Sequence, residues 1–342
     1  MPRSAAGRAI PAASGYPQYS GNLMHPIVSQ DLLERWYCTT IFGAISSTQY
    51  LGDIVGRGDQ IVFFKKPQVS ARRHVKDGTI KHDTLESDSH TMVIDQACEW
   101  SVKMSQVDER MMGMWPQFKA AMIDAAAEAM QQIQDRHILA NLYAEVAAAN
   151  QGANAGCMTG CYNLGEVGAP VRITSGSDWV RLLGRLTAVL SEACMPRENR
   201  YVVAPPIAEY ALMTSTYMAM INANGGFSGS QLLNGQIPQS IMGFTHYISH
   251  NLTSVIDPVT NEQAYYIVAG LPMATAYASV LEKTRTIDDD KDSWDTFYQG
   301  LLVYGFDVLY PQGLAVAYVV FDCEALETVQ CCAPLPGTGE AP

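Results

Sequence analysis

The chain has 342 residues, of which 48% are hydrophobic and 16% charged, so it can bury a substantial core and is not disordered as a whole. Its 34 acidic residues outnumber its 22 basic ones, and the net charge of -12 argues against binding nucleic acid over much of the surface. The longest apolar runs, such as 314–321, are far shorter than the roughly 20 residues that span a bilayer, so no membrane partner is expected. Pro2, Pro11 and Pro17 break up any apolar segment that a secretory signal needs, so export is not expected.

The eight cysteines are scattered along the chain, and reduced thiols are the expectation. Cys157 and Cys161 lie in a Gly-rich loop and could supply two metal thiolates, but no CxxC pair or nearby His completes a tetrahedral set. We therefore predict no metal site there. The adjacent Cys331 and Cys332 are interpreted as surface thiols rather than as a crosslink between subunits.

The N-terminal 55 residues predict an arm, because they contain Pro, Gly and Ser early, then a short apolar patch, and no long periodic element. Two predicted strands follow, at 60–64 and 91–94, separated by about 26 mostly polar residues. That connection is too long for a tight turn, and a structureless loop of this size inside a compact domain is improbable. We therefore expect a β-hairpin that projects outward.

The predicted hairpin is strongly basic, although the chain as a whole is acidic. Between positions 57 and 81 only Asp59 and Asp77 oppose seven basic residues. One interpretation is a solvated charged loop. The favoured interpretation is docking onto an acidic surface, which a neighbouring copy of the chain supplies. Apart from Arg57, the basic residues form the candidate assembly interface: Lys65, Lys66, Arg72, Arg73, Lys76 and Lys81.

Two helices are predicted after the hairpin. Ser105 as a cap and Asp108 in the first turn predict a short helix that ends near Gly113. Pro116 suits the first turn of a longer helix that we expect to run to about Ala149, crossing the whole body. Its predicted buried face is an apolar stripe, and the methionines at 111, 112, 114, 122 and 130 are interpreted as core residues. The stripe consists of Trp115, Phe118, Met122, Ala125, Ala129 and Ile133.

A second α/β region follows the Gly/Asn-rich segment 150–168. Ser177 is the expected cap of its first helix, which ends before Pro196. A strand at 200–204, a helix at 207–221 and a Gly-rich loop at 222–235 come next. The remaining predicted strands lie at 242–249, 264–269, 274–286, 298–309 and 314–321.

No catalytic or cofactor signature stands out. The stretch 225–229 lacks the Lys-Ser/Thr ending of a phosphate loop, and Ser230 spoils a nucleophile elbow. His246 and His250 have no accompanying carboxylate or cysteine cluster, and the acidic run 288–292 lacks the pattern of a calcium loop. The chain is therefore predicted not to be an enzyme, with no catalytic residues, no cofactor and no metal.

The order of these segments resembles the major capsid proteins of tailed double-stranded DNA bacteriophages, which have the Hong Kong 97-type fold. The resemblance covers nearly the whole chain, and none of its motifs is a catalytic signature. Its most telling segments are 58–63 (GDQIVF), 199–205 (NRYVVAP), 232–237 (LLNGQI) with 242–244 (MGF), and 305–308 (GFDV) with 315–318 (AVAY).

The resemblance implies an α+β fold with five parts. These are an N-terminal arm (1–55), an extended β-hairpin loop (56–100), a peripheral domain with a long spine helix (101–155 and 276–325), an axial α/β domain (156–275) and a C-terminal tail (326–342).

The resemblance also implies a structural protein that self-assembles into hexamers and pentamers of an icosahedral shell around double-stranded DNA, without sequence-specific binding. It implies a place in the virion capsid, assembly in the host cytoplasm, and scaffolding, portal and decoration proteins as further partners. An encapsulin-like compartment is the alternative with the same fold. An enzyme with an unrecognised site between 175 and 270 is the alternative from another class.

Overall fold

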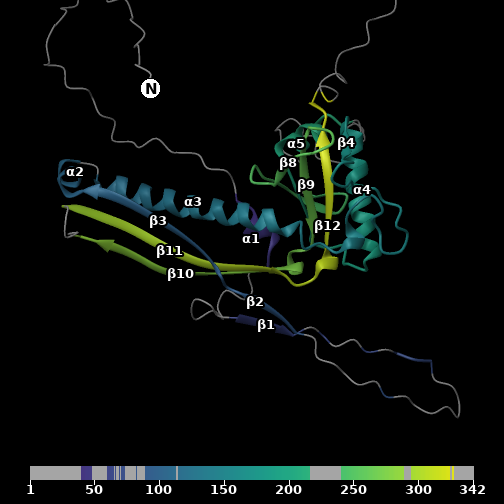
Figure 1. Ribbon diagram of the computed structural model, residues 1–342, viewed down its shortest axis with the longest axis horizontal. Helices are drawn as coiled ribbons and strands as arrows, with labels where there is room; N and C mark the ends of the chain where they lie inside the picture. Colours follow the sequence, from purple (N-terminus) through teal and green to yellow (C-terminus); the bar gives the residue numbers. More distant parts are fainter. Residues whose placement is uncertain are drawn as a thin grey trace, which may run out of the picture.

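The computed structural model describes residues 40–47, 60–64, 66, 69, 71–73, 82, 89–112, 115–215, 240–288, 294–323 and 326. Figure 1 shows an elongated unit, in which a long helix lies along a narrow sheet, joined to a compact unit built around a larger sheet. A β-hairpin lies on the side of the narrow sheet away from the long helix. Among the described helices, none combines the length and the hydrophobicity that a membrane span requires.

The elongated unit consists of three antiparallel strands and one long helix. The strands β3 (Gln96–Ser105), β11 (Asp295–Val308) and β10 (Thr275–Ile287) pair in the order β10-β11-β3. The helix α3 (Trp115–Leu142) covers one face of this sheet, where Met130 and Ile138 pack against Tyr277 and Tyr304. At 1.5 Å per residue its 28 residues span about 42 Å. A long helix along the sheet is therefore present, as predicted, although it is shorter than predicted.

The predicted boundaries of the two helices are partly confirmed. The short helix α2 (Gln106–Met111) begins at its predicted cap, since the Ser105 hydroxyl accepts from the amide of Val107. The long helix ends at Leu142, not near Ala149 as predicted. Beyond a turn, the amide of Ala147 donates to the carbonyl of Pro311 at 3.2 Å, and a 3-10 turn follows, η1 (Ala148–Asn150). These long-range hydrogen bonds override the helix propensity of an alanine-rich segment.

The buried face of α3 also differs from the predicted stripe. Phe118 and Ile133 of the stripe are 37% and 50% exposed, and Met111 is 81% exposed, so the core interpretation is wrong for them and holds for Met130. Trp115 and Lys119 of the N-terminal half contact the ring of Tyr298, but only the C-terminal half of α3 holds fully buried side chains. Its buried residues are Met130, Gln134, Asp135, Ile138, Leu139 and Leu142.

The compact unit is a seven-stranded sheet with helices against it (Figure 1). Its strands follow the order β4-β12-β9-β5-β7-β6, and β8 pairs with β9. They are β4 (Val171–Ile173), β5 (Arg200–Ala204), β6 (Ser240–Ile241), β7 (Phe244–Ile248), β8 (Ser254–Ile256), β9 (Gln263–Gly270) and β12 (Leu314–Phe321). All residues of β5 and β12 are buried, as expected for strands covered on both faces.

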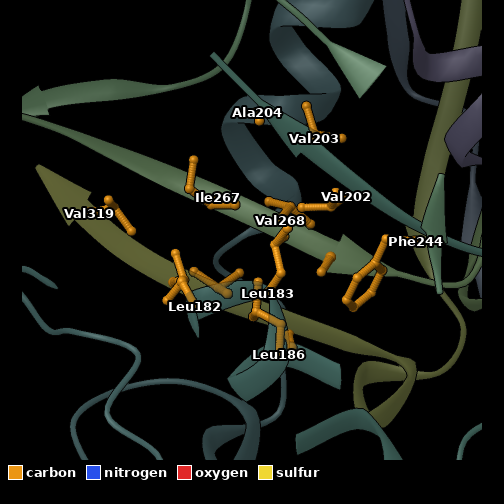
Figure 2. Close-up of a cluster of buried hydrophobic side chains, with 14 of the residues drawn as sticks. Leu182, Leu183, Leu186, Val202, Val203, Ala204, Phe244, Ile267, Val268 and Val319 are labelled. Atoms are coloured by element: carbon orange, nitrogen blue, oxygen red, sulfur yellow. The ribbon is translucent and has the colours of Figure 1, made fainter. Parts of the chain in front are cut away.

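The core of this unit lies between the sheet and the helix α4 (Gly176–Glu192). Figure 2 shows Leu182, Leu183 and Leu186 gathered against Val202 and Val268 of the central strands. These leucines recur at helical spacing, so one face of α4 delivers them to the sheet. The compact unit therefore holds the main hydrophobic core.

Two helix boundaries here correct the sequence prediction. The cap of α4 is Ser175 rather than Ser177, and its hydroxyl accepts from the amide of Asp178 at 3.3 Å. The helix α5 (Pro206–Met213) is shorter than the predicted 207–221. The predicted Gly-rich loop at 222–235 lies outside the described residues. The strands at 60–64, 200–204 and 314–321 match their predictions residue for residue.

Candidate assembly interface

The hairpin consists of β1 (Gln60–Phe64) and β2 (Ser89–Val93), paired antiparallel with Ile61 opposite Met92 and Phe63 opposite His90. Because side chains alternate along strands, the hairpin has two distinct faces. On the inner face, Ile61, Phe63 and Met92 form a cluster with residues of β10 and its surroundings, namely Ala276, Ala278 and Leu309. The hairpin is thus seated on the face of the narrow sheet that α3 does not cover.

The outer face of the hairpin carries exposed apolar side chains. Val62 is 47% exposed, Phe64 77% and Val93 44%. A two-stranded sheet gains too little burial to be stable alone, and contiguous exposed apolar side chains mark sites where proteins interact. This outer face therefore suits contact with another polypeptide.

The connection from the hairpin to β3 passes close over β11 at Gly305. A Cβ atom on Gly305 would lie 2.8 Å from the carbonyl oxygen of Val93 and 3.0 Å from the Cα of Ile94. Only glycine allows the two backbones to approach this closely. Ile94 itself is 1% exposed, so the end of the hairpin is fixed firmly to the body.

A polar contact adds to this attachment. The Nε2 atom of His90 lies 2.9 Å from Oδ2 of Asp307 on β11, and both side chains are partly buried. The other oxygen of Asp307 accepts from the amide of Val308 at 2.8 Å. Burial, and then the negative charge of Asp307, raise the pKa of Glu145, which lies just after α3. No sequence pattern links His90, Glu145 and Asp307, because 55 positions separate the first two and 162 positions separate the last two.

Three of the six predicted basic residues lie in the described part of the chain. Lys66, Arg72 and Arg73 are exposed. The other three, Lys65, Lys76 and Lys81, lie outside the described residues. The described basic side chains are therefore accessible to a partner.

The remaining candidates from the sequence do not come together as a site. His246 is partly buried, its Nε2 has no hydrogen-bond partner among the described residues, and burial lowers its pKa to about 4, whereas His250 is exposed. Cys157 and Cys161 are exposed free thiols. Among the described residues, no group of three or more His, Cys, Asp or Glu side chains could hold a metal ion. Residues 225–230, most of the acidic run, Cys331 and Cys332 lie outside the described part.

An open cleft of about 460 Å³ lies between the end of the arm and the compact unit. Among the described residues that line it, which include Ser46, Ser47, Asn199 and Met273, Glu198 is the single ionisable side chain. A nucleophilic side chain is commonly activated by a general base within hydrogen-bond reach. The described lining of this cleft offers no such pair.

Comparison with solved structures finds the same fold in several phage capsids. The structure of Mycobacterium phage Che8 aligns with a TM-score of 0.64 and 22% sequence identity, covering 89% of this chain and 98% of that one. The capsid structure of the cyanophage P-SCSP1u aligns with a TM-score of 0.64 and 17% sequence identity, covering 89% of this chain and 96% of that one. The mature capsid of bacteriophage PhiM1 aligns with a TM-score of 0.58 and 12% sequence identity, covering 88% of this chain and 93% of that one. At these identities the likeness establishes the fold, which is of the Hong Kong 97 type.

The sequence itself places the chain in a family. No curated protein matches it. Residues 102–317, which include the spine helix, most of the compact unit and the returning strands, match the family described as phage capsid protein. The chain therefore belongs to the phage capsid protein family, and it is a structural shell protein of the virion capsid.

Proposed function

We propose that many copies of this chain close into hexamers and pentamers of an icosahedral shell that encloses the double-stranded DNA genome. The observation that carries this proposal is the hairpin. One face is seated on its own subunit, while the apolar outer face and the basic residues Lys66, Arg72 and Arg73 remain exposed. A chain built in this way completes its burial on a sibling copy.

The five parts take distinct roles in this arrangement. Residues 56–100 form the extended loop that lies over an adjacent subunit, and the axial domain, 156–275, surrounds the local symmetry axes. The peripheral domain, 101–155 with 276–325, carries the spine helix, and residues 1–55 and 326–342 form the arm and the tail. The exposed apolar side chains Phe118 and Ile123 in the N-terminal half of α3 support a role for the peripheral domain in contacts between subunits.

The chemistry of the contact combines apolar adhesion with charge steering. Val62, Phe64 and Val93 supply apolar surface, which contributes most of the binding free energy. The basic side chains attract the loop to the acidic surface of a neighbouring subunit and fix its alignment there. Asp124 and Glu128, both exposed on α3, are examples of the acidic side chains that a sibling copy presents.

The shell encloses DNA without sequence-specific binding. A net charge of -12 also disfavours tight binding of the shell to DNA phosphates. Assembly takes place in the host cytoplasm, with scaffolding, portal and decoration proteins as partners, and the chain has no catalytic role. An encapsulin-like compartment is not favoured, because the matching family and the similar structures are those of phage capsids.

Charge reversal tests this proposal. Replacing Arg72, Arg73 and Lys76 by Glu should abolish or strongly reduce shells in electron micrographs, while the circular dichroism of the subunit stays unchanged. The matched control keeps the charge, with Arg72→Lys, Arg73→Lys and Lys76→Arg, and should assemble normally. Normal shells from the Glu variant would refute the docking role.

A further inference from the structure

The cleft between the end of the arm and the compact unit, here called the junction cleft, has three walls from separate segments. Its lining includes Ser47 of the arm, Glu198 of the turn between α4 and β5, and Met273 of the turn after β9. The turn that carries Glu198 is held from below, because the buried guanidinium of Arg200 donates to the carbonyl of Pro196 at 2.7 Å. This wall is therefore fixed by the core of its own subunit.

Backbone hydrogen bonds hold the other two walls. One is the 3-10 turn η2 (Pro272–Ala274), and the amide of Leu271 just before it donates to the carbonyl of Gly313 at 3.2 Å. The other is the end of the arm, where the amide of Ser47 donates to the carbonyl of Thr275 at 2.9 Å. The junction cleft is thus preformed, and a partner that enters it loses little binding free energy to the ordering of these walls.

The lining of the junction cleft combines apolar side chains with one negative charge. Leu271, Pro272 and Met273 are apolar, and the side chain of Met273 is 62% exposed. Glu198 is exposed and is the single ionisable side chain of the described lining. Such a lining suits a ligand in which an apolar group lies beside one positive charge.

The hairpin presents this combination of groups on its outer face. Phe64 is 77% exposed, and Lys66, two positions later, is also exposed. Side chains two positions apart in an extended chain share a face and lie about 6.6 Å apart. Pro67 follows Lys66 in the sequence and favours an extended conformation at that lysine. An aromatic ring and an ammonium group are therefore available side by side.

We propose that the junction cleft of one subunit receives Phe64 and Lys66 of a second copy of the chain. The inference rests on the proposed function, and it names the surface of the neighbour on which the loop docks. The subunit's own hairpin does not fill its cleft, because its Phe64 remains exposed. The charges are complementary, since Glu198 supplies the carboxylate that Lys66 requires.

The two inserted side chains have different roles. The ring of Phe64 packs against Leu271 and Met273, and a thioether beside an aromatic ring is a favourable contact. An aromatic anchor in a preformed pocket typically carries a large share of the binding free energy of an interface. The ion pair of Lys66 with Glu198 lies at the rim and fixes the alignment of the hairpin on the neighbour.

A charge exchange in the full-length chain tests this assignment. Glu198→Lys and Lys66→Glu each bring like charges together, so each should lower the yield of shells about tenfold, measured by light scattering and electron microscopy. The double variant restores an opposite pair, and its yield should return to within about twofold of the wild type. Glu166→Lys, at an exposed glutamate elsewhere on the compact unit, should assemble like the wild type. Normal assembly of the single variants, or no recovery in the double variant, would overturn the proposal.

The apolar half of the junction cleft has its own test. Met273→Ser should lower the yield of shells about fivefold and leave urea denaturation of the subunit unchanged, because the side chain is largely exposed. The matched control is Met158→Ser, at a methionine that is 80% exposed elsewhere on the compact unit, and it should assemble normally. Equal yields from these two variants would overturn the role of the cleft.

The outcome is separable from that of the proposed function. If replacing Arg72, Arg73 and Lys76 by Glu abolishes shells while Glu198→Lys and Lys66→Glu assemble normally, the loop docks on another part of the neighbour. That result would overturn the junction cleft as the docking site and would still support a loop that joins subunits.

Discussion

The buried carboxylate of Asp135 on α3 accepts a hydrogen bond from the backbone amide of Ile41, 94 residues earlier, at 3.0 Å. The same oxygen accepts from the amide of Phe42, and the other oxygen accepts from Asn251 Nδ2 at 2.8 Å. Ile41 and Phe42 lie at the start of the short helix α1 (Phe42–Ile45). One side chain thus joins the end of the arm, the spine helix and the compact unit.

Loss of this carboxylate should destabilise the subunit. Asp135→Asn replaces an acceptor oxygen by a donor amide opposite other donors, and we expect the free energy of unfolding to fall by about 2–3 kcal/mol. Urea denaturation measures the change. The control is Asp124→Asn on the exposed face of the same helix, which should change stability by less than about 0.5 kcal/mol. Equal effects of the two substitutions would contradict the joining role of Asp135.

Phe63 and Phe64 are neighbours with opposite roles on the hairpin. Phe64→Ser should leave the unfolding free energy of the subunit within about 0.5 kcal/mol, because the side chain is 77% exposed, but should impair shell formation. Phe63→Ser removes an inner-face contact, and should destabilise by about 1–2 kcal/mol. Light scattering during assembly and urea denaturation measure the two effects. If Phe64→Ser assembles like the wild type, the outer face is not an interface.

Burial of His246 predicts a specific dependence of stability on pH. Its pKa is about 4 in the folded chain, below the ordinary 6.5 of a histidine, so the unfolded chain binds a proton more readily between these values. Stability is therefore full above about pH 6.5 and falls by up to about 1.4 kcal/mol per pH unit on the way to pH 4. His246→Leu removes this contribution, and its stability relative to the wild type should rise as the pH falls. A constant difference in urea midpoints from pH 7 to 4 would contradict this account.

The buried side chain of Arg200 donates hydrogen bonds to the last turns of α4 and to the turn that follows it. It is 1% exposed, and its guanidinium donates to the carbonyls of Pro196, Met195 and Thr187 and to the hydroxyl of Ser191. Lysine carries its charge on one nitrogen and does not reproduce this fork. Arg200→Lys should lower the unfolding free energy by about 2 kcal/mol, whereas Arg197→Lys, at an exposed neighbour, should have little effect. Thermal unfolding of both variants checks this difference.

The sequence predicts the strands of this fold better than it predicts the ends of the helices. The β12 run is continuously apolar and bounded by Gly313 and Asp322, so length and composition alone define it. The end of α3 is different, because residues 143–149 are rich in alanine and favour helix locally. What stops the helix is a set of hydrogen bonds to the chain around Pro311 and Leu314, which no local pattern reveals.

The same distinction holds for the candidate interface. The hairpin and its basic charge follow from composition and strand patterns in one stretch of sequence. The alternation of side chains along a strand also indicates that Val62 and Phe64 share a face. Which face of the hairpin packs on the body depends on Ala276 and Ala278, more than 200 residues away. The contact of His90 with Asp307 likewise joins residues 217 positions apart. Long-range contacts of this kind need the structure.

The most direct test is a cryo-EM reconstruction of particles assembled from the purified chain. We predict closed shells in which residues 60–93 of each subunit lie on a neighbouring copy, with Phe64 buried between the two and Arg72 and Arg73 beside acidic side chains of the neighbour. A particle in which Phe64 remains in solvent, or in which this segment contacts only its own subunit, would contradict the account.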